Sequence, residues 1–403
     1  MSVATDSVAV ARPVLGHGTS AAASSTSATA TATAPVNAAA ETRVVALDGI
    51  RGLMTIMVLA SHFFAEVPHG WRAFSLGWVA VLTFFALSGF LVGRLILDKS
   101  DRANFYTVFY VRRFCRTIPV YVFCVLVIFA ALYAFSDRPW ANAHHHIPLW
   151  SYLTFWQNFH MVDANHVGQH WLAPTWTLTV EEHFYLIAPA LLLLTPRRHL
   201  LAMLIIATLL SVAFRAYIFY WSDVNALWGL ALLPGRADAL FCGIIAAIVY
   251  RDNAITWRHY DLALRVAPIV LLLATFVLRL VDGDTGQLTQ VFGLFFVAVA
   301  SSIYILSIAR GAPEADRLTS RSLVFCGHNS YSIYLTHLLV LGLMHGLIFD
   351  AAPDVHTPAQ ILVTLAAIPV ALFVGWVFTR LVEEPITAYG RSWKWSEKRR
   401  GEA

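Results

Sequence analysis

The sequence predicts an all-α membrane protein, a polytopic helical bundle of about ten transmembrane helices with both termini in the cytoplasm. Its composition is the first reason: 58% of the 403 residues are hydrophobic and only 13% are charged, about half the charged fraction of a soluble domain. The second reason is that apolar runs of about twenty residues, long enough to cross a bilayer as helices, recur along the chain. These runs are continuous rather than alternating in polarity, which favours helices over a closed β-barrel.

The predicted elements follow from those runs in chain order. Residues 1–41 are rich in Ala, Ser and Thr and are expected to form a disordered cytoplasmic tail. Residues 42–390 are expected to form one transmembrane domain, since no internal repeat is evident, and residues 391–403 a basic cytoplasmic tail. The expected spans are 44–66, 77–97, 117–136, 176–195, 199–220, 227–250, 264–281, 288–309, 326–349 and 359–382.

The connections between the spans predict the orientation. Basic connections such as "TPRRH" and "RGAPEADRLTSR" alternate with connections such as "VDGDTGQ" and "DAAPDVHTP", which contain acidic residues and no Lys or Arg. The positive-inside rule places the basic connections on the cytoplasmic side, and the net charge of +4 therefore gives no reason to expect nucleic-acid binding. The longest connection on the other side is 137–175, whose segment "IPLWSYLTFWQNF" is expected to be re-entrant or interfacial.

Ionisable residues lie inside several predicted spans, although each costs about 2.5–3.5 kcal/mol at the bilayer centre. In "LDGIRGLMTIMVLASHFF", Arg51 and His62 are eleven residues apart. On a helix they lie within roughly 20° of each other and roughly 16 Å apart along the axis. Asp48 precedes Arg51 by three residues, within reach of an ion pair. Taken alone, Arg51 extending to headgroups and His62 bonding a neighbouring helix would be ordinary features.

Two further spans begin with clusters of like charge. Arg112, Arg113 and Arg116 open the third span. They are either the basic collar that sets topology or an anion site, because guanidinium groups match phosphate oxygens. Glu181 and Glu182 lie about one turn inside the fourth span. This pair either caps the helix start or orients a histidine across the bundle.

Three polar residues lie near the middle of later spans. Arg236 and Asp238 belong to the sixth span, and His337 to the ninth. Hydrogen bonds and ion pairs between helices would explain some of these residues. They do not readily explain all of the buried charges together, so the charges favour a functional site.

These residues resemble the motifs of the acyltransferase 3 family of integral membrane acyltransferases, and the resemblance covers essentially all of the chain after the tail. Arg51 and His62 match the family's Arg-x10-His signature, and Arg113 and Arg116 match its Arg-x-x-Arg element.

Later segments fit the same family in the same order. "FFALSGFLVGRLI" resembles its second-span pattern, and "PGRADALFCG", "NSYSIYLTH" and "VEEPI" also fit. "WTLTVEEHFYLIAP" is similar to the family's Trp-Ser-Leu-x-x-Glu-x-x-Phe-Tyr, with Thr177 in place of the usual serine and Glu181 at the glutamate.

The resemblance implies a bacterial inner-membrane enzyme that transfers an acyl group, usually acetyl, from cytoplasmic acyl-CoA to a hydroxyl acceptor such as a cell-surface glycan. The donor is expected to be acetyl-CoA or another acyl-CoA. Its phosphates are expected to bind Arg113, Arg116 and Arg112, with Arg51 extending the positive site inward. His62 is expected to act either as general base on the acceptor hydroxyl or as the nucleophile that carries the acyl group, with Glu181 orienting it.

Other classes of protein are also compatible with parts of this pattern. A proton-coupled transporter of a glycan precursor or small anion would hold similar buried charges, although carriers more often show internal repeats. Histidines at 144–146, His160, His166 and His170 suggest a metal, but their spacing matches no ligand pattern and no cysteine accompanies them, so no metal is predicted. A non-catalytic scaffold would explain none of the buried charges.

Overall fold

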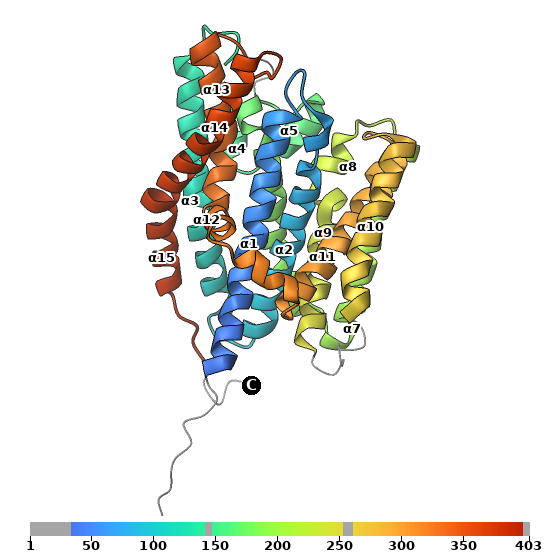
Figure 1. Cartoon of the computed structure of the whole chain (residues 1–403). Helices are drawn as coiled ribbons and strands as arrows, with labels where there is room; N and C mark the ends of the chain where they lie inside the picture. The colour runs from blue at the N-terminus through green and yellow to red at the C-terminus, as the bar shows by residue number, and fades with distance from the viewer. Residues whose placement is uncertain (1–33, 142–146, 253–260, 398–403) are drawn as a thin grey trace, which may run out of the picture.

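The computed structural model of the chain describes residues 34–141, 147–252 and 261–397 (Figure 1). Within these ranges every regular element is a helix, so the predicted fold class is confirmed. Ten helical segments in these ranges are long and apolar enough to cross a membrane, which confirms the predicted number.

The helices follow the chain in a simple order. The long ones are α1 (Ala34–Phe64), α2 (Gly77–Lys99), α3 (Phe105–Ala134), α6 (Trp176–Leu194), α7 (Arg197–Trp221), α9 (Leu233–Arg251), α10 (Asp261–Asp282), α11 (Leu294–Ala309), α13 (Ser330–Phe349) and α14 (Pro358–Phe378). The short ones are η1 (Arg72–Phe74), α4 (Leu149–Leu153), α5 (Gln157–Ala164), η2 (His170–Thr175), α8 (Leu227–Ala231), η4 (Thr289–Gly293), η5 (Pro313–Thr319), α12 (Arg321–His328), η6 (Thr379–Glu383) and α15 (Glu384–Ser392).

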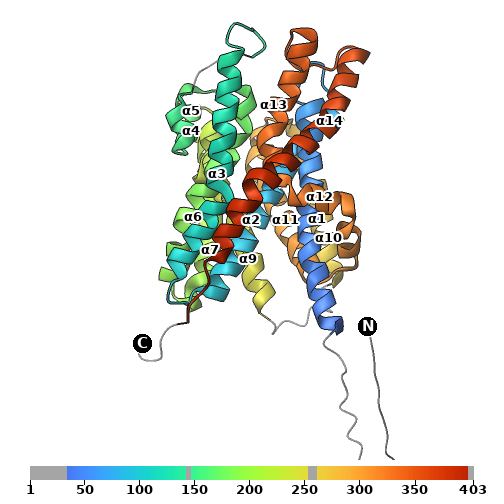
Figure 2. The same cartoon turned by 90° about the vertical axis from the view of Figure 1, so that its left-hand side faces the viewer.

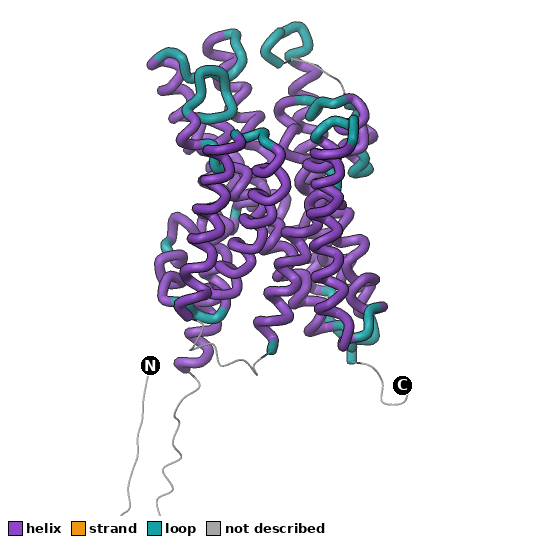
Figure 3. The backbone as a smooth tube through the Cα atoms, turned by 90° about the vertical axis from the view of Figure 1, so that its right-hand side faces the viewer, coloured by secondary structure: helices purple, strands orange, loops and turns teal. Residues whose placement is uncertain are grey.

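The bundle has two distinct ends. α1 begins and α15 ends at the same end of the bundle, which is called the terminal end here (Figures 1 and 2). The opposite end, called the far end, carries the α13–α14 connection and the short helices α4 and α5. Figure 3 shows that loops gather toward these two ends, with mostly helical backbone between them. The segment "IPLWSYLTFWQNF" thus forms two short helices at the far end rather than a further long span.

Several helix boundaries differ from the predicted ones. α3 begins at Phe105 rather than at 117, so the arginines at 112, 113 and 116 lie within the helix. Hydropathy marks the apolar part of a helix, whereas the hydrogen-bonded backbone continues beyond it. α1 begins at Ala34, inside the segment predicted to be a tail, where alanines favour helix.

The last two predicted spans are interrupted helices. The ninth is divided at Asn329 into α12 and α13. The tenth continues from α14 through a short π-helical segment, η6, into α15. π-Helical turns often occur at functional sites, and η6 contains the buried carboxylate of Glu383, which accepts a hydrogen bond from Ser332 at 2.9 Å.

Close contact with α12 fixes the position of α1 in the bundle. A Cβ atom on Gly49 would lie 1.8 Å from the backbone oxygen of Leu318, and one on Gly327 would lie 1.8 Å from that of Asp48. Only glycine allows backbones to approach this closely. This packing holds the stretch of α1 that carries Arg51.

A buried ion pair joins α7 to α9. Arg215 Nη2 lies 2.6 Å from Asp238 Oδ2, and both side chains are fully buried. Arg215 also donates to the carbonyl oxygens of Gly235 and Val291. Asp238 therefore pairs with an arginine of another helix. Arg236 instead donates to the Leu230 carbonyl at 2.7 Å and lies over the ring of Trp176.

Candidate functional site

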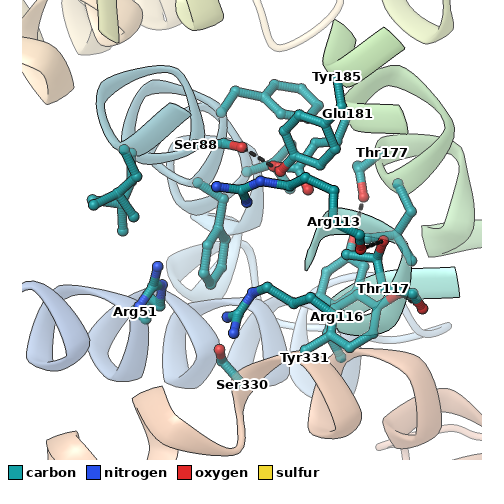
Figure 4. A pocket seen from close by; sticks show the side chains of 17 residues that line it. Arg51, Ser88, Arg113, Arg116, Thr117, Thr177, Glu181, Tyr185, Ser330 and Tyr331 are labelled. Carbon is teal, nitrogen blue, oxygen red and sulfur yellow. Dashed lines mark hydrogen bonds between the residues drawn. The ribbon is translucent and has the colours of Figure 1, made fainter. Parts of the chain in front are cut away.

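A cavity lies inside the bundle among α1, α2, α3, α6 and α13 (Figure 4). One wall is apolar and comes mainly from α2, which contributes Phe84, Phe85 and Leu91. The polar residues that line the cavity are Arg51, Ser88, Arg113, Arg116, Thr117, Thr177, Glu181, Tyr185, Ser330, Tyr331 and Tyr334. The cavity thus brings together residues from segments far apart in the sequence, including three of the arginines and one of the glutamates selected from the sequence.

Three guanidinium groups give the cavity its character. Figure 4 shows Arg51 entering from α1, with Arg113 and Arg116 reaching from α3 into the same space. Arg51 forms an ion pair with Asp48, as the sequence spacing predicted. Arg113 lies over the rings of Tyr185 and Phe109, at 5.1 and 5.9 Å from their centroids. Burying cations is costly unless anions accompany them, so this group of arginines suits a polyanionic ligand.

Arg112 lies outside the cavity. Its Nη2 donates to the backbone oxygen of Trp393 at 2.6 Å, and its guanidinium lies over the ring of Trp395. The next turn of the same segment is held by Asn104, whose side-chain oxygen accepts from the backbone N–H of Ser396. Arg112 therefore fastens residues 393–397 to the start of α3, and the structure does not bring it together with Arg113 and Arg116.

The two glutamates of α6 lie near the arginines rather than near His62. Ser88, Tyr185 and Arg113 surround the Glu181 carboxylate, and Glu182 lies beside Thr117. The hydroxyls of Ser88 and Tyr185 are themselves 2.5 Å apart. Among the described residues, the recorded contacts of Glu181 are with this group. The expected pairing of Glu181 with His62 is therefore wrong, because α6 presents Glu181 to α2 and α3.

His62 pairs instead with His337, the titratable residue selected from the ninth span. His62 Nδ1 and His337 Nε2 are 2.6 Å apart, and His337 Nδ1 lies 2.8 Å from the backbone oxygen of Tyr334. A carbonyl oxygen can only accept, so His337 Nδ1 carries a proton. With both rings neutral, His337 Nε2 accepts from the Nδ1–H of His62. This chain of hydrogen bonds leaves the lone pair of His62 on Nε2.

Glu66 is the carboxylate nearest to that lone pair, and the sequence analysis missed it. Its Oε2 lies 3.5 Å from His62 Nε2, and its Oε1 accepts a 2.8 Å hydrogen bond from Ser61. Burial raises the pKa of the Glu66 carboxyl above its ordinary value, while Ser61 and His170 act in the opposite direction. The spacing of four residues from His62 was a usable signal, because residues i and i+4 share a helix face.

Tyr334 closes the end of the cavity nearest to the two histidines. Its hydroxyl donates to the carbonyl of Pro174 at 3.1 Å and lies 2.9 Å from the hydroxyl of Thr177. Its ring is also 5.8 Å from the ring of His337. Neither His62 nor His337 is among the described residues that line the cavity. Tyr334 therefore separates the cavity from the histidine pair in this conformation.

No group of three possible metal ligands occurs in the part of the chain that the structure describes. The histidines at 144–146 lie outside the described residues. His160 packs against the ring of Trp150, and the imidazole of His166 accepts from the backbone of Gly168.

Comparison with known proteins identifies relatives of the whole bundle. The family model described as an acyltransferase domain matches residues 44–380. The peptidoglycan O-acetyltransferase OatA of Listeria monocytogenes is 26% identical over 362 residues, which are 86% of this chain and 56% of that protein. The O-acetyltransferase OatA of Staphylococcus aureus is 23% identical over 379 residues, 88% of this chain and 59% of that protein.

The chain spans little more than half the length of these curated relatives. The part they share is the helical bundle, since the matched residues contain the ten membrane-spanning segments nearly in full. No solved structure matches the chain.

Proposed function

The chain belongs to this family of acyltransferase domains, and we propose that it is a membrane O-acetyltransferase. Its proposed donor is acetyl-CoA, or another acyl-CoA, and its proposed acceptor is a hydroxyl of a cell-surface glycan. The name of the Listeria monocytogenes relative makes peptidoglycan the first glycan to test. The observation that carries the proposal is the alignment of an arginine-lined cavity with a histidine whose Nε2 is free to react.

The cavity suits the donor by charge and by length. Coenzyme A carries a diphosphate and a ribose phosphate, and guanidinium groups bind phosphate oxygens in pairs of parallel hydrogen bonds. Arg113 and Arg116 line the cavity with Arg51. Along α1, His62 lies roughly 16 Å beyond Arg51, a distance that an extended pantetheine arm spans. We assign the terminal end to the cytoplasm of a bacterial cell, since the basic connections lie there.

The reaction then occurs at Nε2 of His62. In the direct route, Nε2 removes the proton of the acceptor hydroxyl as its oxygen attacks the thioester carbonyl. The C–S bond breaks, and the CoA thiolate takes that proton from the imidazolium. In the stepwise route, Nε2 attacks the thioester first, CoA leaves as its thiol, and the acyl group passes from nitrogen to the acceptor oxygen. Both routes require the Nε2 lone pair.

Binding of acetyl-CoA tests the donor site without knowledge of the acceptor. We expect Arg113→Ala/Arg116→Ala to weaken acetyl-CoA binding at least tenfold, because each charge-assisted hydrogen bond contributes about 1.5–3 kcal/mol. The measurement is equilibrium binding to purified protein in lipid nanodiscs. Arg198→Ala, an exposed arginine at the start of α7, is the matched control.

Two results would contradict the donor site. Equal binding by the wild type and the double variant would exclude Arg113 and Arg116 from donor recognition. Absence of binding by folded wild type at millimolar acetyl-CoA would favour the transporter of a glycan precursor or small anion.

His337 is expected to control the reactivity of His62. His337→Phe keeps an aromatic ring but removes the acceptor for the Nδ1–H of His62, so the proton is free to move to Nε2. We expect acetyl transfer to fall roughly 10²-fold, with acetyl-CoA binding unchanged. His337→Gln supplies an amide oxygen as acceptor and is expected to lose less. Transfer rates of the two variants, measured side by side, test this order; equal losses would argue for a packing role alone.

A further inference from the structure

We propose that Glu66 is the acceptor-binding residue of this site: its carboxylate holds the attacking hydroxyl against Nε2 of His62. This inference rests on the proposed function and adds the group that positions the second substrate. The acceptor class is a polyol, such as a sugar, whose hydroxyl donates one hydrogen bond and has neighbouring hydroxyls to offer.

The position of Glu66 leaves space for a ligand atom. Its Oε2 is 3.5 Å from His62 Nε2, which is longer than an ordinary N–H···O hydrogen bond. Its Oε1 is held by Ser61, which is buried and packs against the start of α2 at Gly77. One oxygen of the carboxylate is thus fixed by the protein, and the other faces the reactive nitrogen without a direct bond to it.

Glu66 is not needed to orient His62. The Nδ1 atom of His62 already has a partner in His337, at 2.6 Å, and the backbone oxygen of Tyr334 fixes the proton on His337. A carboxylate beside the other ring nitrogen would otherwise be expected to bind a protonated Nε2 and remove its lone pair. The gap therefore points to a third group between Oε2 and Nε2.

Glu66 also lies on the side from which an acceptor would come. It follows α1 toward the far end, whereas the arginine-lined cavity lies on the other side of Tyr334. About half of its side chain is exposed (52%), compared with 17% for His62. His170, an exposed residue at the start of η2, interacts electrostatically with Glu66 and His62. A polar, partly open group thus borders the histidine on the face away from the donor.

The chemistry balances without another reactant. The acceptor hydroxyl hydrogen-bonds to Glu66 Oε2 through one of its orientations and presents its proton to His62 Nε2 in the reactive one. As the O–H bond breaks, the new O–C bond forms at the acyl carbon and the C–S bond of the thioester breaks. The proton then passes from His62 to the CoA thiolate, so Glu66 begins and ends in the same state.

The test measures acetyl-CoA turnover in nanodiscs as released CoA thiol, first with water as acceptor and then with lysozyme-solubilised, de-O-acetylated peptidoglycan fragments. Glu66→Ala is expected to lower turnover roughly 10- to 100-fold, because a hydrogen bond to a charged group is lost. Glu66→Gln retains an acceptor oxygen and is expected to raise the KM for the fragments more than it lowers kcat. The KM for acetyl-CoA is expected to stay the same in both.

Two matched variants separate binding from structure. Asp163→Asn removes an exposed carboxylate of α5, also at the far end, and is expected to behave like wild type. Ser61→Ala releases Oε1 and is expected to cause a smaller loss than Glu66→Ala. Turnover by Glu66→Ala and Glu66→Gln within twofold of an active wild type would overturn the role of Glu66. Wild type that releases no CoA with either acceptor would instead contradict the proposed function.

Discussion

Replacing His62 with alanine is expected to lower acetyl transfer at least ~10³-fold, because both chemical routes use its Nε2 atom. General base catalysis alone contributes about 10²–10⁴-fold in enzymes, and the stepwise route would be lost altogether. The measurement is transfer of radiolabelled acetyl from acetyl-CoA to peptidoglycan fragments, with protein reconstituted in proteoliposomes.

The His62 variant carries its own controls. Acetyl-CoA binding should persist, since the cavity is lined by Arg51, Arg113 and Arg116 and not by His62. His62→Gln keeps a polar side chain of similar reach without a basic nitrogen and is expected to be as inactive as His62→Ala. Transfer by either variant within tenfold of wild type would end the assignment of His62 as the reacting group.

Breaking the buried Arg215–Asp238 pair is expected to have the largest effect on stability. Asp238→Ala would leave a fully buried guanidinium without its counter-ion, and the loss of one partner of a buried pair costs about 3–5 kcal/mol. We expect a much lower temperature of thermal unfolding in detergent, with loss of folded protein during purification.

A double variant distinguishes charge from packing at this pair. Arg215→Met/Asp238→Leu removes both charges and keeps similar volumes, and pairs replaced in this way often lose little stability. The double variant should therefore unfold at a higher temperature than Asp238→Ala. If both variants unfold together, the hydrogen bonds of Arg215 to Gly235 and Val291 are the main contribution.

The sequence was most informative where residues share one helix. The eleven-residue spacing of Arg51 and His62 predicted a common face, and both are found on the inner side of α1, with Arg51 in the cavity and His62 against His337. The Asp48–Arg51 ion pair also followed from spacing. Apolar runs predicted the number of spans because bilayer thickness fixes helix length.

Contacts between helices were harder to predict. Nothing in the α6 sequence shows whether Glu181 faces α1 or faces α2 and α3, since that depends on the rotation of packed helices. For the same reason, Asp238 was selected but its partner Arg215 was not. A lone arginine in the fifth span was itself a signal, because charges inside a membrane usually have partners. Glu66 was missed because it follows the apolar run and looks like an ordinary loop carboxylate.

The closure at Tyr334 matters for the permeability of the membrane. A continuous wet path through a bundle with so many ionisable groups would conduct protons, and each elementary charge crossing the membrane dissipates about 2.3 kcal/mol per 100 mV. With Tyr334 bonded to Pro174 and Thr177, the two watery compartments stay apart. In the proposed reaction only a covalently held acetyl group changes sides, so the cell would export it without discharging its electrochemical gradient.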